Sequence, residues 1–265
     1  MIVALISKKG GVGKTTSAVN LAAALAAGGR RVLLVDLDSQ ASASRSLGVE
    51  RAALAPSVAD VLLWGMPLAQ AIRPTGVAGL DLLTASADLV SADLELGKFH
   101  GREDRLRRAL EPARSDYEFV FLDCPPTLSL VPINALAAAD VFLAPVVPQF
   151  LAIEGVASLL KAAERVRHHH NRDLELLGLL LTMVDYRNNA TRDNVARLRA
   201  EYGPEVFAVE IRINIRLAEA PEHARTIFQY DPTATGAEAY RLAADELLLR
   251  IAELARQREL ARAVG

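Results

Sequence analysis

A glycine-rich loop with two lysines follows the first apolar run of the chain and has the composition of a phosphate-binding site. The loop reads Lys9-Gly10-Gly11-Val12-Gly13-Lys14-Thr15-Thr16, and the run before it spans Ile2 to Ile6. Glycines let backbone N–H groups turn toward phosphate oxygens, and the helix expected next adds the positive end of its dipole. We expect Lys14 to reach the β and γ phosphates and Thr15 to ligate Mg²⁺. The sequence therefore predicts a site for a nucleoside triphosphate.

The loop departs in one position from the strict pattern G-x-x-x-x-G-K-[ST]. That pattern places glycine at position 8, where this chain has Lys8. A plain glycine-rich turn between strand and helix is the alternative interpretation. It is disfavoured because such a turn does not need the order Gly-Lys-Thr.

Acidic residues end two further apolar runs of the sequence. Asp36 and Asp38 follow Leu33-Leu34-Val35, and Asp123 follows Phe119-Val120-Phe121-Leu122. In open α/β sheets, ligands bind beyond the carboxyl ends of the strands. Asp123 is expected to hold Mg²⁺ through water, since this ion takes few protein ligands. The alternative for Asp36 and Asp38 is that each caps the segment that follows.

Length and composition indicate one α/β domain spanning residues 1–265. The chain is 51% hydrophobic and 5% aromatic, and its single cysteine, Cys124, excludes an internal disulfide. Cys124 is interpreted as a packing residue, not a nucleophile. Short apolar runs alternate with helical stretches, which is typical of a parallel sheet. The expected strands are 2–7, 31–36, 80–84, 119–123, 141–146, 176–183 and 206–211, and the expected helices are 15–27, 103–113, 153–170, 191–202 and 236–262.

The loop resembles the deviant Walker A motif of the ParA/MinD ATPases, in which the extra lysine, here Lys9, is a signature. The resemblance implies a three-layer P-loop NTPase with a mostly parallel, twisted sheet flanked by helices. It also implies that Lys9 crosses an ATP-dependent homodimer interface and contacts the nucleotide of the other subunit. A cation there offsets charge on the transferred phosphoryl group, so Lys9 and Lys14 are both candidate catalytic residues. The alternative for Lys9 is a solvated loop charge.

Two acidic segments extend the resemblance. Asp36-Leu37-Asp38-Ser39-Gln40 is similar to the family's Asp-x-Asp-Pro-Gln element, with Ser39 in place of proline, and Asp123-Cys124-Pro125-Pro126 matches its Asp-Cys-Pro-Pro signature. By this match Asp38 positions the attacking water and contacts the Mg²⁺ shell, and Asp36 supports it. The metal set is thus Thr15, Asp38 and Asp123, with ATP and Mg²⁺ as the implied cofactors.

The resemblance continues nearly to the C-terminus and favours ParA over MinD. The segments 149–155, 181–185, 214–221 and 230–232 follow in ParA order. In the family, a proline and an asparagine two residues later line the adenine pocket. The matching positions are Arg212 and Asn214, and Arg212 is a departure that leaves base selection open.

DNA binding is implied by the resemblance and not by overall charge. The formal net charge is -2, so any nucleic-acid surface must be local. Two family arginines that bind DNA without sequence preference fall on Arg187 and Arg216. Acidic residues are interspersed in the same region, so a solvated or ion-paired role is the alternative for each arginine.

The function implied is an ATP-dependent dimerising switch that partitions a cargo with a ParB-like adaptor, in the cytoplasm and on the nucleoid. The main rival is a MinD-like regulator that cycles on membranes. No stable membrane association is expected, because acidic residues interrupt the basic face of the C-terminal helix, which is expected to pack onto the domain. A metabolic synthetase of the same fold is a third possibility. His168-His169-His170 is interpreted as a polar helix end, because adjacent helical residues point in different directions.

Overall fold

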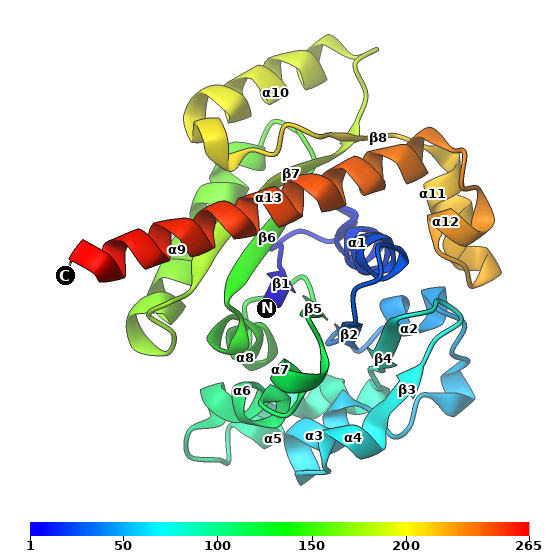
Figure 1. The fold of residues 1–265 in the computed structure, drawn as a ribbon, viewed down its shortest axis with the longest axis vertical. Coiled ribbons are helices and arrows are strands. Elements are labelled where there is room, and N and C mark those ends of the chain that lie inside the picture. The colour runs from blue at the N-terminus through cyan, green and yellow to red at the C-terminus, as the bar shows by residue number, and fades with distance from the viewer. Residues whose placement is uncertain (265) are drawn as a thin grey trace.

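The computed structural model describes residues 1–264, with side chains to residue 260. Eight strands form one sheet in the order β3-β4-β2-β5-β1-β6-β7-β8 (Figure 1). All neighbouring strands are parallel except β3, which pairs antiparallel with β4 at one edge. The strands are β1 (Ile2–Leu5), β2 (Val32–Asp36), β3 (Ile72–Pro74), β4 (Leu80–Leu83), β5 (Phe119–Asp123), β6 (Val141–Val146), β7 (Glu175–Val184) and β8 (Ile211–Arg212).

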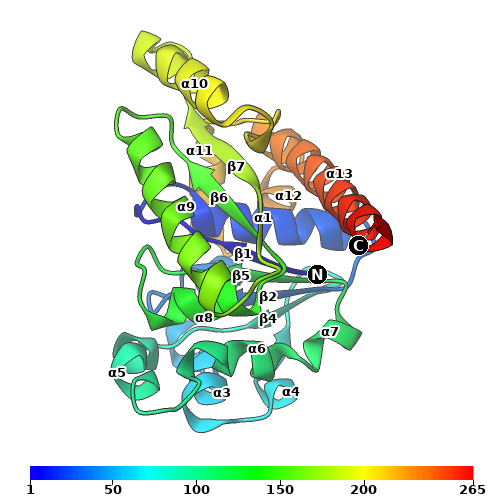
Figure 2. The ribbon, with the colours of Figure 1, turned by 90° about the vertical axis from the view of Figure 1, so that its left-hand side faces the viewer.

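Helices cover both faces of the sheet, so the domain has three layers (Figure 2). One face carries α1 (Lys14–Ala27), α12 (Ile227–Tyr230) and α13 (Thr235–Val264), with α2 (Ser42–Ser46) and α11 (Ile215–Glu219) beside them. The other face carries α3 (Val58–Trp64), α4 (Leu68–Ala71), α5 (Ala92–Leu96), α6 (Arg105–Leu110), α7 (Ala113–Asp116), α8 (Leu130–Ala138), α9 (Ala152–His169) and α10 (Asn189–Tyr202). The expected fold class is confirmed.

Two hydrophobic cores form because each central strand is buried on both faces. In β1, Val3 and Leu5 join the core under α1 and α13, whereas Ile2 and Ala4 join the core under α8 and α9. Side chains of a strand alternate between faces, so an uninterrupted apolar run supplies both cores at once. This is why the central strands read as continuous apolar sequence.

The sequence located the buried strands well and the edges of the sheet poorly. The bounds of β5 and β6 are as predicted, and the predictions for β1, β2, β4 and β7 lie within two residues of the observed ends. The predicted strand 206–211 is wrong: β8 contains only Ile211 and Arg212, and Val206 makes an isolated bridge to Leu179. The N–H groups of Ala208 and Val209 instead donate to the carboxylate of Glu246 on α13.

Prolines explain two further differences. The predicted helix 103–113 is divided into a short 3-10 turn, α6 and α7, and Pro112 lies at the second division. Pro112 has no N–H to continue the helical hydrogen bonds. The unpredicted helix α8 carries Pro132 in its first turn, where the missing N–H costs nothing.

The C-terminal helix packs onto the domain, as expected. Tyr240, Ala243 and Leu247 are buried against the core under α1, and the Tyr240 hydroxyl lies 3.0 Å from that of Ser17. Within residues 1–264, no helix has both the length and the apolar composition needed to cross a membrane.

Candidate nucleotide-binding site

The glycine-rich loop joins the end of β1 to the start of α1. Gly11 and Gly13 have φ values of +70° and +74°, in the left-handed region that favours glycine. Gly13 is the N-cap of α1 and has no side chain to cap the first N–H groups, which leaves these donors available to an anion. The buried Thr182 hydroxyl donates to the carbonyl of Val12 at 2.8 Å and so anchors the loop to β7. A Cβ added at Gly10 would meet nothing within 4 Å, so the loop faces open space.

Lys14 forms a buried ion pair with Asp123 directly behind the loop. Its Nζ lies 2.8 Å from Asp123 Oδ1, and the side chains are 6% and 0% exposed. Burial alone lowers the pKa of Lys14, but the charge and hydrogen bond of Asp123 outweigh it and leave the pKa above its ordinary value. Asp123 Oδ2 is buried without a hydrogen-bond partner in the described part of the chain.

The residues around Asp123 fit a magnesium site. The second carboxylate oxygen of Asp123 is an unused acceptor for a metal-bound water. Thr15 and Thr16 are half-buried in the first turn of α1, immediately after Lys14, and the Thr16 carbonyl accepts from Asn20 at 2.8 Å. Hydroxyl and carboxylate oxygens are ligands suited to Mg²⁺. The predicted ligands Thr15, Asp38 and Asp123 thus come from the loop and from the ends of β2 and β5.

Asp36 organises the turn that carries Asp38. Its carboxylate accepts from the Asp38 N–H at 3.2 Å, and from the Ser44 N–H and hydroxyl at 2.8 and 2.7 Å. Asp38 is half-buried and accepts from the Gln40 N–H at 3.0 Å. The Ser44 hydroxyl in turn accepts from the Ala85 N–H at 3.2 Å, which links the turn to the end of β4. Sequence reasoning missed Ser44, because only the fold brings it to Asp36.

Asp36 and Asp123 lie side by side at the ends of paired strands. The two residues are partners in the β2–β5 register, and both are fully buried. Burial, and next the charge of Asp123, raise the pKa of Asp36 to about 7. Lys14 is therefore the counter-charge to Asp123, whereas Asp36 beside it favours its neutral form.

Lys9 lies exposed at the mouth of the loop, and its Nζ donates to the side-chain oxygen of Gln149. Gln149 is neutral, and among the residues that the structure describes Lys9 has no carboxylate oxygen within 4.0 Å. A cavity of about 330 Å³ separates the loop from the start of α9, and both residues line it. Phe150, which follows Gln149, is 79% exposed.

The two predicted adenine-pocket positions have other contacts. Asn214 is the N-cap of α11: its side-chain oxygen accepts from the N–H groups of Arg216 and Leu217, and its amide donates to Thr235 at 2.8 Å. The guanidinium of Arg212 lies 5.4 Å from the ring centre of Tyr186. A role of either residue in base binding stays a prediction.

The two predicted DNA-binding arginines are exposed but ion-paired. Arg187 is 85% exposed and makes two 2.8 Å hydrogen bonds to Asp185. Arg216 pairs with Glu219 at 2.8 Å and with Asp231 at 3.6 Å. Such exposed pairs contribute little to stability, and a role of either arginine in DNA binding stays a prediction.

Cys124 and the histidine run 168–170, for which no catalytic or metal-binding role is expected, have structural roles. Cys124 is fully buried, and burial raises the pKa of its thiol to about 12, which confirms it as a packing residue. His168 and His169 form the last turn of α9 and His170 caps it, as expected for a polar helix end. Among the described residues, no three His, Cys, Asp or Glu side chains are grouped to hold a metal.

Comparison with known proteins places the chain in a family. Residues 1–176 match a family model described as an AAA domain. The chain is 42% identical to the sporulation initiation inhibitor protein Soj of Bacillus subtilis, over 90% of this chain and 94% of that protein. It is 47% identical to the chromosome-partitioning ATPase Soj of Thermus thermophilus, with 95% and 96% covered.

A solved structure supports the same fold. A crystal structure titled cobyrinic acid a,c-diamide synthase from Mycobacterium smegmatis, with bound ADP and magnesium, superposes with a TM-score of 0.82. It is 36% identical, with 93% of each chain covered. The parallel sheet, the glycine-rich loop and the lysine–aspartate pair define a P-loop nucleoside triphosphatase. The chain belongs to the ParA/Soj family of chromosome-partitioning ATPases.

The buried ion pair predicts a large loss of stability when only its cation is removed. Lys14→Met leaves the Asp123 carboxylate buried beside Asp36, which should cost about 3–5 kcal/mol of unfolding free energy without nucleotide. Urea unfolding measures this cost. The double variant Lys14→Met/Asp123→Asn should recover most of it. If the double variant is no more stable than Lys14→Met alone, Lys14 does not compensate the buried charge of Asp123.

The raised pKa of Asp36 predicts that the nucleotide-free protein loses stability as pH rises toward neutrality. Between its ordinary value near 4 and about 7, the folded state keeps a proton that the unfolded chain has released. Asp36→Asn does not titrate, so its stability relative to wild type should rise by on the order of 3 kcal/mol from pH 5 to pH 8. Guanidinium unfolding across this range is the measurement, with the exposed Asp245→Asn as control. Parallel curves for wild type and Asp36→Asn would contradict the assignment.

Proposed function

We propose that this chain is an ATP-dependent, dimerising switch that partitions a cargo over non-specific DNA together with a ParB-like adaptor. The observation that carries the proposal is the buried Lys14–Asp123 pair behind an open, glycine-rich loop, with one free carboxylate oxygen. The chromosome-partitioning relatives support the biological role, and the ADP and magnesium in the Mycobacterium structure support the cofactors.

The site residues divide the chemistry of hydrolysis among them. The backbone N–H groups from Gly10 to Thr16 would bind the phosphates, and Lys14 would turn from Asp123 to the β and γ oxygens. Thr15 would ligate Mg²⁺ and Asp123 would hold one of its waters, and the ion would supply charge neutralisation on the phosphates. Asp38, held by the Asp36 turn, would orient the attacking water.

The dimer is supported by where apolar side chains remain exposed. Parallel strands end together at the left of Figure 2, where the loop projects and α5 lies. Seven large apolar side chains near the carboxyl ends of β4, β6, β7 and β8 are 43–79% exposed. They are Val90, Leu94, Phe150, Leu151, Met183, Ile213 and Ile215. Large apolar side chains that are exposed at the same sheet edge as a polar site are typical of a protein interface. In a face-to-face dimer, Lys9 would release Gln149 and reach the partner's phosphates.

A DNA surface would form near the ends of β7 and β8, where Arg187 and Arg216 lie. The exposed arginines Arg192 and Arg225 occupy the same part of the chain and have no carboxylate within 4.0 Å among the described residues. Arginines of this kind would contact the phosphates of DNA and not its bases, so the proposed DNA binding has no sequence preference.

A synthetase is the second candidate, because the Mycobacterium structure carries such a name. A synthetase would hydrolyse ATP only when an acceptor carboxylate and a nitrogen donor are present. The partitioning switch needs neither. Phosphate release from protein, ATP and Mg²⁺ alone, increased by DNA and adaptor, therefore favours the switch.

Asp38→Ala should separate turnover from dimerisation. The variant should keep an ATP-dependent dimer, while phosphate release falls about a hundredfold or more, because the attacking water loses its positioning group. Light scattering with ATP and a phosphate-release assay measure the two properties. Lys14→Ala is the control and should lose nucleotide altogether. Loss of nucleotide binding in Asp38→Ala would refute the role given to Asp38.

Retention on random duplex DNA with ATP and Mg²⁺ should weaken steeply with salt. Arg187→Ala or Arg216→Ala should reduce both the affinity and the slope of log affinity against log salt, by about one unit per lost phosphate contact. Arg167→Ala is a matched control, since Arg167 is also exposed and ion-paired but lies on α9. The same retention assay is repeated with anionic liposomes in place of DNA. Retention by liposomes alone would favour the MinD-like rival.

A further inference from the structure

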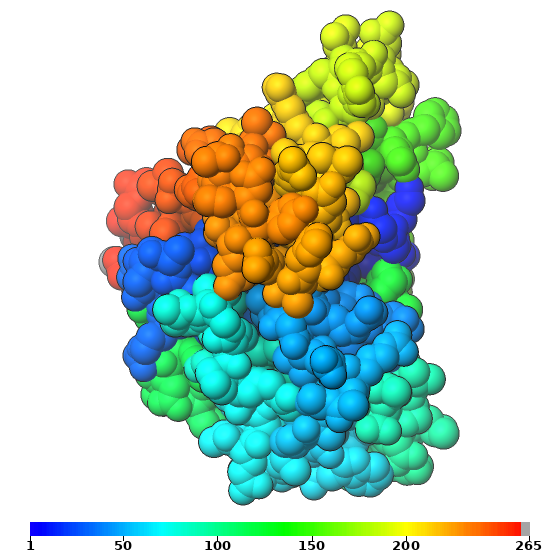
Figure 3. Space-filling model, turned by 90° about the vertical axis from the view of Figure 1, so that its right-hand side faces the viewer, coloured from blue at the N-terminus to red at the C-terminus, as the bar shows by residue number. Residues whose placement is uncertain are grey.

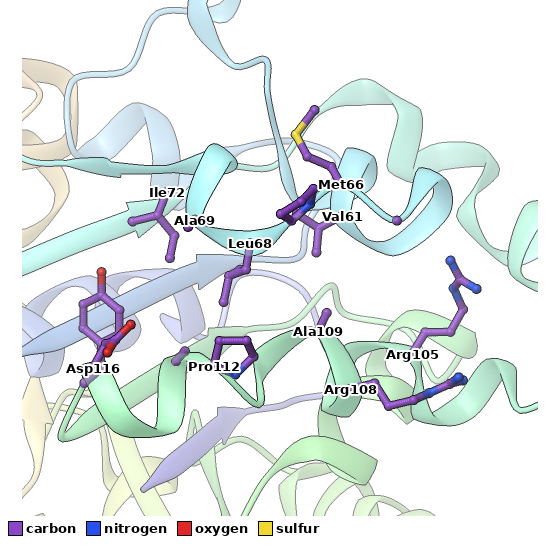
Figure 4. A pocket seen from close by; sticks show the side chains of 14 residues that line it. Val61, Met66, Leu68, Ala69, Ile72, Arg105, Arg108, Ala109, Pro112 and Asp116 are labelled. Carbon is purple, nitrogen blue, oxygen red and sulfur yellow. The ribbon is translucent and has the colours of Figure 1, made fainter.

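A groove of about 580 Å³ lies in the helical layer opposite α13 and shares no lining residue with the nucleotide site. Figure 4 shows its two walls. Val61, Leu68 and Ile72 from the α3–α4 region form one wall, and Ala109 and Pro112 from α6 and α7 form the other. The middle of the groove is therefore apolar, and its volume is within the range of binding pockets.

The two ends of the groove carry opposite charges. Arg105 and Arg108 stand at the α6 end, and Asp116 stands at the α7 end. Arg105 donates to the Leu62 carbonyl at 2.6 Å, and Arg108 donates to the Gly101 carbonyl at 2.8 Å. In the part of the chain that the structure describes, neither has a carboxylate oxygen within 4.0 Å. Burial and the charge of Arg108 lower the pKa of Arg105, as expected for two cations without a counter-charge.

An exposed tryptophan directly precedes two groove residues in the chain. Trp64, the only tryptophan of the chain, is 68% exposed at the end of α3. The next two residues, Gly65 and Met66, line the groove. Tryptophan and arginine are the residue types most enriched among energetically dominant interface contacts. Their presence beside one apolar groove indicates a protein partner.

We propose that the groove binds an amphipathic helix of a partner protein, with an acidic residue facing Arg105 and Arg108 and a basic residue facing Asp116. Glu111 and Pro112, between α6 and α7, keep helical backbone angles, so the Cα atoms of Arg108 and Asp116 are about 12 Å apart along the chain direction. On the partner helix, residues seven or eight apart lie on one face at a similar separation. The acidic and basic residues should thus be seven or eight positions apart, with leucine or an aromatic residue between them.

This inference does not depend on the nucleotide switch, because the groove and the phosphate site have no residue in common. The two proposals therefore fail separately. ATP hydrolysis without peptide binding would overturn only the groove, and peptide binding without ATP hydrolysis would overturn only the switch.

The test selects ligands from a phage library of random 18-residue peptides that lack tryptophan. The full chain is the target, and Ala109→Gln, which places a longer polar side chain in the groove, is used for counter-selection. Arg108→Ala removes a groove cation. Arg107→Ala is its matched control, because Arg107 lies on the same helix, is exposed and pairs with Asp104 outside the groove. Circular dichroism melts check that all three variants fold, and phosphate release should stay unchanged in each.

The selected peptides should carry the predicted charge spacing and shift the fluorescence of Trp64 when they bind. Arg108→Ala should weaken binding about tenfold or more, and Arg107→Ala less than twofold. Peptides that bind Ala109→Gln equally well, ignore Arg108→Ala or lack an acidic residue would overturn the proposal, and so would a selection that enriches nothing. Self-association that Ala109→Gln abolishes in the absence of nucleotide would assign the groove to a second copy of the chain and would also overturn it.

Discussion

The site depends on one buried ion pair, in which Lys14 neutralises Asp123 where the sheet places two carboxyl groups together. The ends of β2 and β5 are neighbours, so their last residues, Asp36 and Asp123, are forced side by side. Like charges at this separation disfavour ionisation of both groups unless a cation is near. Lys14 is that cation, and the glycine-rich loop holds it there. The loop therefore has two roles: it holds the lysine that neutralises a buried carboxylate of the sheet, and it forms the phosphate-binding site.

The same pair fixes the positions of the Lys14 and Asp123 side chains. An unpaired buried lysine or aspartate would be costly, so the pair keeps both residues in place without ligand. In the proposed function, phosphates would take the place of Asp123 as the partner of Lys14, and both Asp123 oxygens would then be available to metal-bound water. This is a physical reason for one residue of the pair to lie on the loop and the other on a strand.

The sequence predicted most of this arrangement where the signals are local. The loop, the apolar runs and the terminal aspartates adjoin one another along the chain, so residue order alone located them. Ser44 and Gln149 could not be found in this way, because their contacts with Asp36 and Lys9 exist only once the sheet has formed. The short β8 was missed for a related reason: Glu246, on a distant helix, takes the N–H groups that a longer strand would use. The Asp185–Arg187 pair spans two residues, and its spacing was visible in the sequence.

The groove and the nucleotide site are joined by the strand between them, and the packing of that strand limits what can pass along it. Tyr117 lines the groove, and β5 begins two residues later and ends at Asp123. Every residue of β5 is buried, and the strand pairs with β1 and β2 over its length. Close packing and pairing on both sides hold β5 firmly in this arrangement, and coupling between sites is carried by elements that have two discrete arrangements. A helix bound in the groove would thus tether a partner to either nucleotide state. The carboxyl edge, where Lys9 and the exposed apolar side chains lie, is where the proposed switch would respond to ATP.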